Sequence, residues 1–497
     1  MSDRTYVLAA ARRFSRQVTD LAAWVSTRLD EHLWTKQREV AESVTAHRRT
    51  AVQSCHGVGK SYLASRTVAW WLDTHPPGEA FAVTTAPTFS QVRGVLWREI
   101  GKAHRKGRLI GRVNQTEWLI GDELVAFGRK PADTDPTAFQ GIHARYVLVV
   151  LDEACGIPKD LWIAAGALAT NADCRILAIG NPDDPGSYFA EVCKPGSGWN
   201  VLQISAFDSP NFTGEPIPAA LRPLLVGPEW VDEMRRDVGE GSPVWIAKVE
   251  GRFPVDADDQ VVRYAAVSAC QRLPEDPAAV DVPVVLGVDV GAGGDMTVVR
   301  ERRGNRAGRV WRKSTPDSPE AVDLVLRAIA ETGATAVHID SIGVGWGVAG
   351  SLQEKRSQGV HGARVVKVNV GTTARDSKRF PKLRDELWWT VGRQLSEDRA
   401  WDLSGLDDQT VSQLCAPKYG IDVSGRIKVE PKEDTIKRIG RSPDDADALL
   451  LAFYSPTGTL EDFLTAYART CPGCGYSNPR AAKVCGSCKA PLTDERR

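Results

Sequence analysis

The sequence predicts an α/β protein with two successive sheet-containing domains and a very small cysteine-rich unit at its C-terminal end. From about residue 50 to 207, near-continuous apolar runs alternate with helical stretches, a pattern typical of a parallel sheet with helices on both faces. A second α/β alternation begins at residue 282 and continues to about 455. Four of the ten cysteines lie within the last 27 residues, which predicts a third and much smaller unit.

Five strands are expected in the first domain, each a short apolar run bounded by turn residues. They are TAVQS (50–54), AFAVTTA (80–86), YVLVVLD (146–152), CRILAIGN (174–181) and NVLQISAFD (200–208). A stretch rich in Pro and Gly then predicts a linker with a small helical subdomain. We therefore expect boundaries at 1–210, 211–258, 259–460 and 465–497.

Length and composition restrict the class of protein. A chain of 497 residues is too long for one compact core, and 42% hydrophobic with 25% charged residues is typical of a globular protein. Lys and Arg together equal Asp and Glu at 63 each, so any basic surface must be local. The absence of a long apolar run and of a signal-peptide pattern predicts a cytosolic protein without a membrane segment.

Residues 54–61, Ser-Cys-His-Gly-Val-Gly-Lys-Ser, predict a phosphate-binding loop. Such a loop needs a preceding strand, a glycine-rich turn whose N–H groups face the phosphates, and a following helix N-terminus. Lys60 is expected to reach the β- and γ-phosphates of ATP, and Ser61 to bind Mg²⁺. Ser54 stands where the usual pattern has Gly, which is tolerated if its φ is negative. The loop residues assigned to the nucleotide are Ser54, Gly57, Val58, Gly59, Lys60 and Ser61.

A second acidic signal supports a nucleotide site in this domain. Asp152 and Glu153 end a buried strand, at the sheet edge where ligands bind in such folds. We expect Asp152 to organise the Mg²⁺ shell and Glu153 to polarise the attacking water. The alternative is that the two acids merely end the strand in solvent, and the phosphate-binding loop at residues 54–61 argues against it.

Two further residues are assigned to the same nucleotide site. Gln37 lies just before the first strand, where its amide could read an adenine edge, although an ordinary amphipathic helix start also explains it. Asn181 follows another strand in LAIGNPDDP, which places an amide near the γ-phosphate as a sensor of hydrolysis.

The second domain carries acidic residues in apolar surroundings. A lone carboxylate in a buried strand is costly unless it is paired or bound to metal. Asp289 lies in such a strand, Asp340 ends another, and Asp444 and Asp447 share a helix face at i, i+3. These four are expected to hold two Mg²⁺ or Mn²⁺ ions, an arrangement that supports phosphodiester hydrolysis. Two nearby acids are weaker candidates, because Asp445 points away from Asp444 and Asp295 is equally explained as a turn residue.

Near the C-terminal end, Cys471, Cys474, Cys485 and Cys488 form two CxxC pairs separated by ten residues. Four thiolates at this spacing predict a tetrahedral Zn²⁺ site of the zinc-ribbon type. Disulfides would be the alternative, but they are rare in the cytosol. The role of this unit stays open between DNA contact through Arg480, Lys483 and Lys489 and docking onto a partner.

Taken in order, the motifs resemble those of the large terminase subunit of tailed bacteriophages over roughly residues 30–455. They are SCHGVGKS, TAPTFSQVRGVLWREI, VLVVLDEA, AIGNP, SAFDSPNF, VEGRFP, GVDVGAGGD, VHIDSIGVG and SPDDADALLLA. The resemblance implies a P-loop ATPase domain that drives double-stranded DNA into a procapsid. It also implies an RNase H/resolvase-like nuclease domain that cuts the concatemer, since the DxxDAL containing Asp447 looks like the last motif of that nuclease superfamily.

The same resemblance implies partners and a further catalytic residue. The partners are the small terminase subunit and the portal protein, with a homo-oligomeric ring at the portal and no membrane. The host-cell cytoplasm is the expected location, apart from transient stays at the procapsid portal. Arg93 is the first choice for the family's arginine finger, with Arg66 and Arg145 as alternatives.

Two other functions compete with a packaging enzyme. A helicase-like DNA repair or remodelling ATPase would carry a second RecA-like half, whereas an acidic nuclease pattern follows the first domain here. A non-enzymatic prophage remnant is disfavoured because Lys60, Asp152 and Asp289 are intact.

Overall fold

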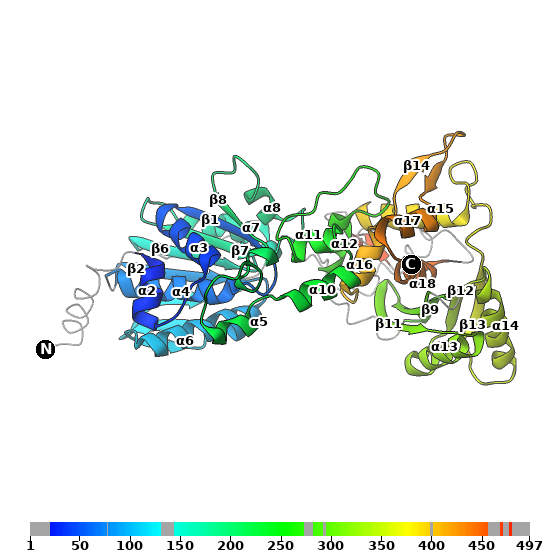
Figure 1. Ribbon diagram of the computed structural model, residues 1–497, viewed down its shortest axis with the longest axis horizontal. Helices are drawn as coiled ribbons and strands as arrows, with labels where there is room; N and C mark the ends of the chain where they lie inside the picture. Colours follow the sequence, from blue (N-terminus) through cyan, green and yellow to red (C-terminus); the bar gives the residue numbers. More distant parts are fainter. Residues whose placement is uncertain are drawn as a thin grey trace, which may run out of the picture. The chain divides into compact units, whose positions relative to one another are not determined.

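The computed structural model of the chain is shown in Figure 1. It describes residues 20–76, 78–130, 144–272, 282–291, 295–397 and 401–455, with the backbone of 468–470 and 477–479. The chain divides into two compact units. Unit 1 comprises Met1–Arg236 and Val244–Pro254, and unit 2 comprises Asp237–Pro243 and Val255–Arg497. The segment 211–258 is shared between the two units, and the boundaries expected from the sequence stay a prediction.

Unit 1 is built on an eight-stranded sheet in the order β3-β4-β5-β2-β6-β7-β1-β8. The six strands from β5 to β8 in this order are parallel, and β3 and β4 extend the sheet as an antiparallel edge. All five strands expected from the apolar runs are confirmed. The strands are β1 (Arg49–Ser54), β2 (Ala80–Thr85), β3 (Arg112–Asn114), β4 (Glu117–Ile120), β5 (Glu123–Gly128), β6 (Tyr146–Asp152), β7 (Arg175–Gly180) and β8 (Asn200–Ile204).

Helices cover both faces of this sheet, as the continuous apolar runs predict. The group on one face is α2 (Leu21–Leu29), α3 (Thr35–Ala46), α4 (Lys60–Thr74) and α6 (Trp97–Gly107), and α7 (Lys159–Leu168) and α8 (Tyr188–Val192) cover the other. The remaining elements before β9 include α5 (Phe89–Gln91), the π-helix η1 (Val92–Leu96), η2 (Ala154–Gly156), η3 (Ala206–Asp208), α9 (Pro210–Thr213), η4 (Ala219–Leu224), α10 (Pro228–Asp237) and α11 (Pro243–Lys248).

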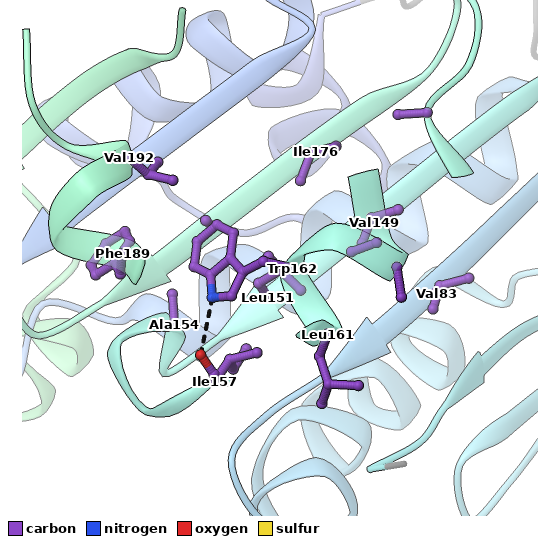
Figure 2. Close-up of a cluster of buried hydrophobic side chains, with 14 of the residues drawn as sticks. Val83, Val149, Leu151, Ala154, Ile157, Leu161, Trp162, Ile176, Phe189 and Val192 are labelled. Atoms are coloured by element: carbon purple, nitrogen blue, oxygen red, sulfur yellow. Dashed lines mark hydrogen bonds between the residues drawn. The ribbon is translucent and has the colours of Figure 1, made fainter. Parts of the chain in front are cut away.

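Trp162 of α7 lies at the centre of the core on the second face (Figure 2). Its ring stacks against Phe189 with centroids 6.0 Å apart, and its indole N–H donates to the Ile157 carbonyl oxygen at 3.2 Å. Burying a large apolar side chain of this kind contributes about 3 kcal/mol. This packing holds α7 and α8 against the strands that carry the candidate site.

Unit 2 contains a five-stranded mixed sheet in the order β11-β10-β9-β12-β13. The first three strands in the chain form an antiparallel meander, and β12 and β13 then run parallel to β9. The strands are β9 (Val284–Asp289), β10 (Met296–Arg303), β11 (Arg306–Ser314), β12 (Ala336–Asp340) and β13 (Arg364–Val368), with a hairpin of β14 (Tyr419–Ile421) and β15 (Ile427–Val429). The helices are α12 (Tyr264–Gln271), α13 (Ser318–Thr332), α14 (Val344–Ser357), α15 (Leu383–Glu397), α16 (Asp408–Leu414), α17 (Lys432–Ile439) and α18 (Asp444–Phe453).

Side chains of β9 alternate between two helical layers. Leu286 and Val288 pack into the apolar core formed with α13 and α14. Gly287 faces α18 so closely that an added Cβ would lie 2.1 Å from the Ala448 carbonyl oxygen. Because alternate residues of a strand share a face, Asp289 also faces α18. The pleat of one strand therefore directs the carboxylate toward the helix that carries the other acids.

The two remaining strands are β16 (Ala468–Thr470) and β17 (Ser477–Pro479), which pair antiparallel. The four cysteines of the expected zinc ribbon lie outside the described residues. Among the helices that the structure describes, none is long and apolar enough to cross a membrane.

Candidate functional site

The sequence 54–61 folds as a strand, a tight turn and a helix start. Strand β1 ends at Ser54 and α4 begins at Lys60, with Gly57 and Gly59 at φ of 68° and 79° between them. Positive φ is accessible to Gly at little cost, so these two residues make the turn possible. Ser54 ends the extended strand and is not among the described residues with positive φ, which satisfies the condition for replacing Gly there.

Four hydrogen bonds join the phosphate-binding loop to other segments of unit 1. The Cys55 amide donates to the Ile204 carbonyl at 2.8 Å, and the Val226 amide donates to the Gly57 carbonyl at 2.8 Å. The Gln37 side-chain amide donates to the Val58 carbonyl at 3.1 Å, and the His56 amide donates to the Lys248 carbonyl at 3.2 Å. These bonds leave the N–H groups of the first turn of α4, which have no partner inside a helix, to face a ligand.

Gly251, in the motif VEGRFP, lies directly against the backbone of β8 and of the phosphate-binding loop. Its φ is 66°, and an added Cβ would lie 2.3 Å from the Ile204 carbonyl oxygen and 2.8 Å from the Cys55 nitrogen. Only a residue without a side chain allows this approach of one backbone to another. The segment after α11 therefore packs directly on the entrance to the loop.

Lys60, Ser61, Asp152 and Asn181 converge at the carboxyl ends of β1, β6 and β7. The Lys60 ammonium donates to Asn181 Oδ1 at 2.9 Å and to the Cys55 carbonyl at 3.2 Å. Ser61 Oγ donates to Asp152 Oδ2 at 2.9 Å, and Asn181 Nδ2 donates to the Ser54 carbonyl at 2.7 Å. The hydroxyl, carboxylate and ammonium groups form one set of contacts around the loop, and this donor set suits a Mg²⁺-bound triphosphate.

The two acids at the end of β6 differ in environment. Asp152 is 2% exposed, and burial raises its pKa while its bond from Ser61 lowers it. Glu153 has φ of 49°, an unusual left-handed conformation for a residue other than Gly. Burial raises the pKa of Glu153, Lys60 lowers it, and Asp152 and Asp183 raise it further. A general base is most effective when its pKa lies near the working pH, so a raised pKa suits Glu153 to this role near neutral pH.

The three arginines weighed for the finger role lie in different surroundings. Arg66 is buried on α4 between Glu31 at 2.8 Å and Glu99 at 3.0 Å, which explains its presence structurally. Arg145 precedes β6 and pairs with Asp173 at 3.1 Å, at the opposite end of the strand from Asp152. Arg93 is exposed on the π-helix η1. Single π-turns within helices are frequent at functional sites.

In unit 2, Lys432 joins three of the four expected acids. Its ammonium group lies 2.9 Å from Asp447, 3.0 Å from Asp444 and 3.1 Å from Asp289. Asp340 ends β12, the strand that pairs with β9, and its carboxylate accepts a hydrogen bond from the Ile342 amide at 3.1 Å. We call Asp289, Asp340, Asp444 and Asp447 the acid cluster.

Electrostatics within the acid cluster favour a bound cation. Burial raises the pKa of Asp289 to about 8, with Lys432 opposing the shift and Asp447 and Asp444 adding to it. Burial also raises the pKa of Asp340 to about 6, and Asp447 adds to this shift. For Lys432, burial lowers the pKa but the three carboxylates raise it more strongly. Among the residues that the structure describes, no group of three or more Asp, Glu, His or Cys side chains is arranged to hold a metal ion.

Asp445 belongs to a different network, as its helix position predicts. It is 1% exposed and pairs with Arg312, while Gln409 and Gln413 donate to its other oxygen at 3.0 Å and 2.9 Å. The side chain is thus satisfied by neutral amides and one guanidinium away from Lys432. Asp295 is exposed in the turn before β10.

Sequence reasoning missed Lys432 and the segments that hold the phosphate loop. Lys432 opens α17 directly after Pro431, and a lone Lys at a helix start carries no signal of its partners. Val226 and Gly251 lie in a Pro- and Gly-rich region that predicts a linker, and only the fold brings them to residues 55–57.

Fold and site geometry together define a two-unit α/β protein with a phosphate-loop geometry in one unit and a buried acid cluster in the other. No family model matches the chain. A curated relative, the "Probable terminase, large subunit" of Enterobacteria phage P7, is 25% identical over 466 residues, which are 85% of this chain and 88% of the relative. The resemblance to phage large terminase subunits is thereby confirmed.

Solved structures similar to this chain include large terminases at low identity. The large terminase of a thermophilic bacteriophage, in complex with ADP, is 12% identical with a TM-score of 0.36, covering 88% of this chain and 98% of its own. The HK97 bacteriophage large terminase is 12% identical with a TM-score of 0.34, covering 91% and 99%. The nuclease domain of the large terminase subunit gp2 of bacterial virus Sf6 is 16% identical with a TM-score of 0.34, covering 40% and 99%.

Proposed function

We propose that this chain is the motor and nuclease subunit of a phage DNA-packaging machine. ATP hydrolysis in unit 1 drives translocation of double-stranded DNA into a procapsid, and a two-metal endonuclease in unit 2 cuts concatemeric DNA. The observation that carries the proposal is the presence, in one chain, of the Lys60–Asn181 and Ser61–Asp152 contacts and of an acid cluster in which Lys432 contacts three members. The phage P7 relative, which matches 85% of the chain, supports the combination.

In unit 1, the residues that would hold ATP and Mg²⁺ are those already in mutual contact. Gly57, Val58, Gly59 and the first turn of α4 offer N–H groups to the phosphates, and Lys60 offers its ammonium group. Ser61 and Asp152 supply the hydroxyl and carboxylate oxygens that Mg²⁺ prefers. Gln37 reads the base, and Asn181 senses the γ-phosphate through its bond to Lys60.

Two residues act on the hydrolysis itself. Glu153 accepts the proton of the attacking water, a role suited to a carboxylate whose pKa is raised by burial. Arg93 is the proposed arginine finger, because it is exposed on η1 whereas the Arg66 guanidinium is engaged by two carboxylates. A finger of this kind stabilises the charge that develops on the transferred phosphoryl group.

In unit 2, Asp289, Asp340, Asp444 and Asp447 are the proposed ligands of two Mg²⁺ or Mn²⁺ ions. The three oxygens within 3.1 Å of one ammonium nitrogen already converge on a positive charge. Bound ions would supply Lewis-acid activation of water and stabilisation of the leaving oxygen. The meander β9–β10–β11 followed by parallel β12 and β13 supports an RNase H/resolvase-like domain.

The C-terminal cysteines are proposed to form a zinc ribbon. Cys471, Cys474, Cys485 and Cys488 have the spacing of a tetrahedral thiolate site. Purified protein is expected to contain about one Zn²⁺ per chain, and Cys471→Ser to lower it. Elemental analysis that finds no zinc in protein purified without chelators would remove this proposal.

The proposed partners are double-stranded DNA, the small terminase subunit and the portal protein, with a homo-oligomeric ring during packaging in the host cytoplasm. The deciding experiment is an assay of purified protein on plasmid DNA with Mn²⁺, Mg²⁺ or EDTA, each with and without ATP. Cleavage that requires metal, together with ATP hydrolysis, is the expected result. Absence of both activities in folded protein would contradict the proposal.

A further inference from the structure

Exposed apolar side chains gather at the sheet edge that carries the acid cluster. Ile342 is 52% exposed, Val344 39% and Trp346 66%, and all three follow the end of β12. Met296 is 38% exposed at the start of β10, which lies beyond the end of β9 because the two strands are antiparallel. Several exposed apolar side chains at one edge of a sheet are typical of a binding surface.

The exposed indole of Trp346 is paired with a cation. Lys367 Nζ lies 4.8 Å from the centroid of the Trp346 ring, in a cation–π contact. Lys367 is on the edge strand β13, opposite Ile339 and one residue before the position opposite Asp340. Among the described residues, no carboxylate lies within ion-pair distance of Lys367. Its positive charge is therefore available to an anionic ligand.

Trp346 is anchored close to the backbone of the acid cluster. It lies in the first turn of α14, and an added Cβ on the neighbouring Gly345 would fall 1.9 Å from the Asp340 carbonyl oxygen. The helix start therefore rests directly on the strand end that presents Asp340. His338 faces α18, and Asp340, two residues further along β12, faces the same side of the sheet. Ile339 packs on the opposite side with α14, the helix that carries Trp346. Trp346 and the acids therefore lie on opposite sides of the sheet but at the same strand end.

We propose that Trp346 stacks on a base of the DNA next to the bond that is cut, while Lys367 contacts the adjoining phosphate. The inference rests on the proposed nuclease function and makes Trp346 and Lys367 positioning residues for that reaction. An aromatic ring beside an unpaired cation matches the combination of base and phosphate in a nucleic acid strand. An apolar side chain inserted at a base step also unstacks that step and kinks the duplex.

Charge at the same edge favours DNA over a protein partner. The chain that follows β13 carries Lys378 and Lys382, both exposed and without an ion-pair partner in the described residues. Gly371 of this segment lies within contact of Ile342, since its added Cβ would be 3.4 Å from the Ile342 Cδ1 atom. Lys382 lies opposite Thr373, two residues after Gly371, and Lys367 contacts Trp346, so the patch has positive charge beside it that suits a phosphate backbone.

The experiment compares variants of the full chain on two DNA substrates in Mn²⁺: a perfect duplex, and the same duplex with a few mispaired bases. Trp346→Ala is expected to raise KM on the perfect duplex about tenfold with little change in kcat, as for loss of one stacked base. The loss is expected to be smaller on the mispaired duplex, because its bases are already unstacked. Trp346→Phe should restore most of the activity, and Val360→Ala, which truncates a 58% exposed side chain after the far end of α14, should match wild type.

Binding in EDTA gives readouts that do not depend on cleavage. Lys367→Ala is expected to lower the slope of log affinity against log salt by about one, whereas Trp346→Ala should leave that slope unchanged. The fluorescence of a 2-aminopurine base in the duplex should change when wild type binds and should stay unchanged when Trp346→Ala binds. If wild-type protein bound DNA this way but did not cleave it, the nuclease function would fail while the stacking surface would stand.

Two outcomes would overturn the inference. In the first, Trp346→Ala binds and cleaves both substrates like wild type, which includes the case of a surface used by a protein partner. In the second, Trp346→Ala and Trp346→Phe are equally defective on both substrates and melt at a lower temperature than wild type. That result would make Trp346 a structural residue.

Discussion

The ammonium group of Lys432 lies 2.9 Å from a carboxylate oxygen of Asp447, and the same nitrogen also contacts Asp289 and Asp444. One positive charge therefore balances part of a cluster whose acids would otherwise repel one another in a buried site. A divalent cation would compete with this ammonium group for the same oxygens. Lys432 is thus expected to limit metal affinity and to stabilise the metal-free protein.

Replacing Lys432 tests this competition. Lys432→Ala should lower the Tm in EDTA, because the acids lose their counter-charge, and should raise the apparent affinity for Mn²⁺ severalfold. Differential scanning fluorimetry over a Mn²⁺ titration measures both. Lys437→Ala on the same helix, where Lys437 pairs with the exposed Asp434, serves as the control. Unchanged Mn²⁺ affinity in Lys432→Ala would show that the ammonium does not occupy the metal position.

The raised pKa values in the acid cluster predict the pH dependence of stability without metal. A carboxyl group whose folded pKa lies above its unfolded value binds more protons when folded, so its contribution to stability falls as pH rises through that window. With the pKa of Asp289 at about 8 and that of Asp340 at about 6, the window extends from about pH 4 to about pH 8. The raised pKa of Lys432 contributes stability throughout this window, since an unfolded Lys loses its proton only above about pH 10.

Thermal melts in EDTA from about pH 5 to about pH 9 check this sign. Wild-type Tm should fall more steeply with pH than that of Asp289→Asn, which no longer titrates at this position. Mn²⁺ should stabilise wild type more at the high-pH end, because metal binding requires deprotonated carboxylates. Parallel curves for the two proteins would contradict the assigned shift.

Asp445 is a matched contrast to the acid cluster on the same helix. Its carboxylate is buried and accepts hydrogen bonds from Arg312 and two glutamines. Asp445→Asn should destabilise the protein by roughly 2 kcal/mol, because the two glutamine amides lose a charged acceptor while Arg312 keeps its pair with Asp407. Mn²⁺ affinity per folded molecule should be unchanged. Denaturant unfolding and Mn²⁺ titration separate the two effects, and weakened Mn²⁺ binding at full stability would move Asp445 into the metal site.

Glu153→Gln separates binding from turnover in unit 1. The amide keeps the shape but cannot accept a proton, so the variant should bind ATP and hydrolyse it at least about a hundredfold more slowly. Lys60→Ala should lose hydrolysis while Mn²⁺-dependent DNA cleavage stays measurable, and Lys194→Ala, an exposed lysine paired with Glu191, is the control. ATP binding and turnover that fall together in Glu153→Gln would make Glu153 structural.

Local patterns predicted the elements but not the contacts between distant segments. The apolar runs ending at Asp152 and Asp289 revealed strands, because continuous burial and strand length are properties of the segment itself. The strands β3, β4 and β5 were not predicted, and β3 and β4 are short and partly polar. Lys432 reaches the acids because the fold brings the start of α17 close to them, which no periodicity encodes.

The most direct measurement of the central claim is plasmid cleavage and ATP hydrolysis by Asp289→Asn, assayed side by side with wild type. Asp289 is 9% exposed beside Lys432, Asp444 and Asp447, and the substitution keeps its shape while removing its charge. Mn²⁺-dependent cleavage should fall by about two orders of magnitude or more, with ATP hydrolysis retained and the Tm in EDTA equal to or above that of wild type. Normal cleavage by a variant that melts well below wild type would make Asp289 a structural residue and contradict the nuclease assignment.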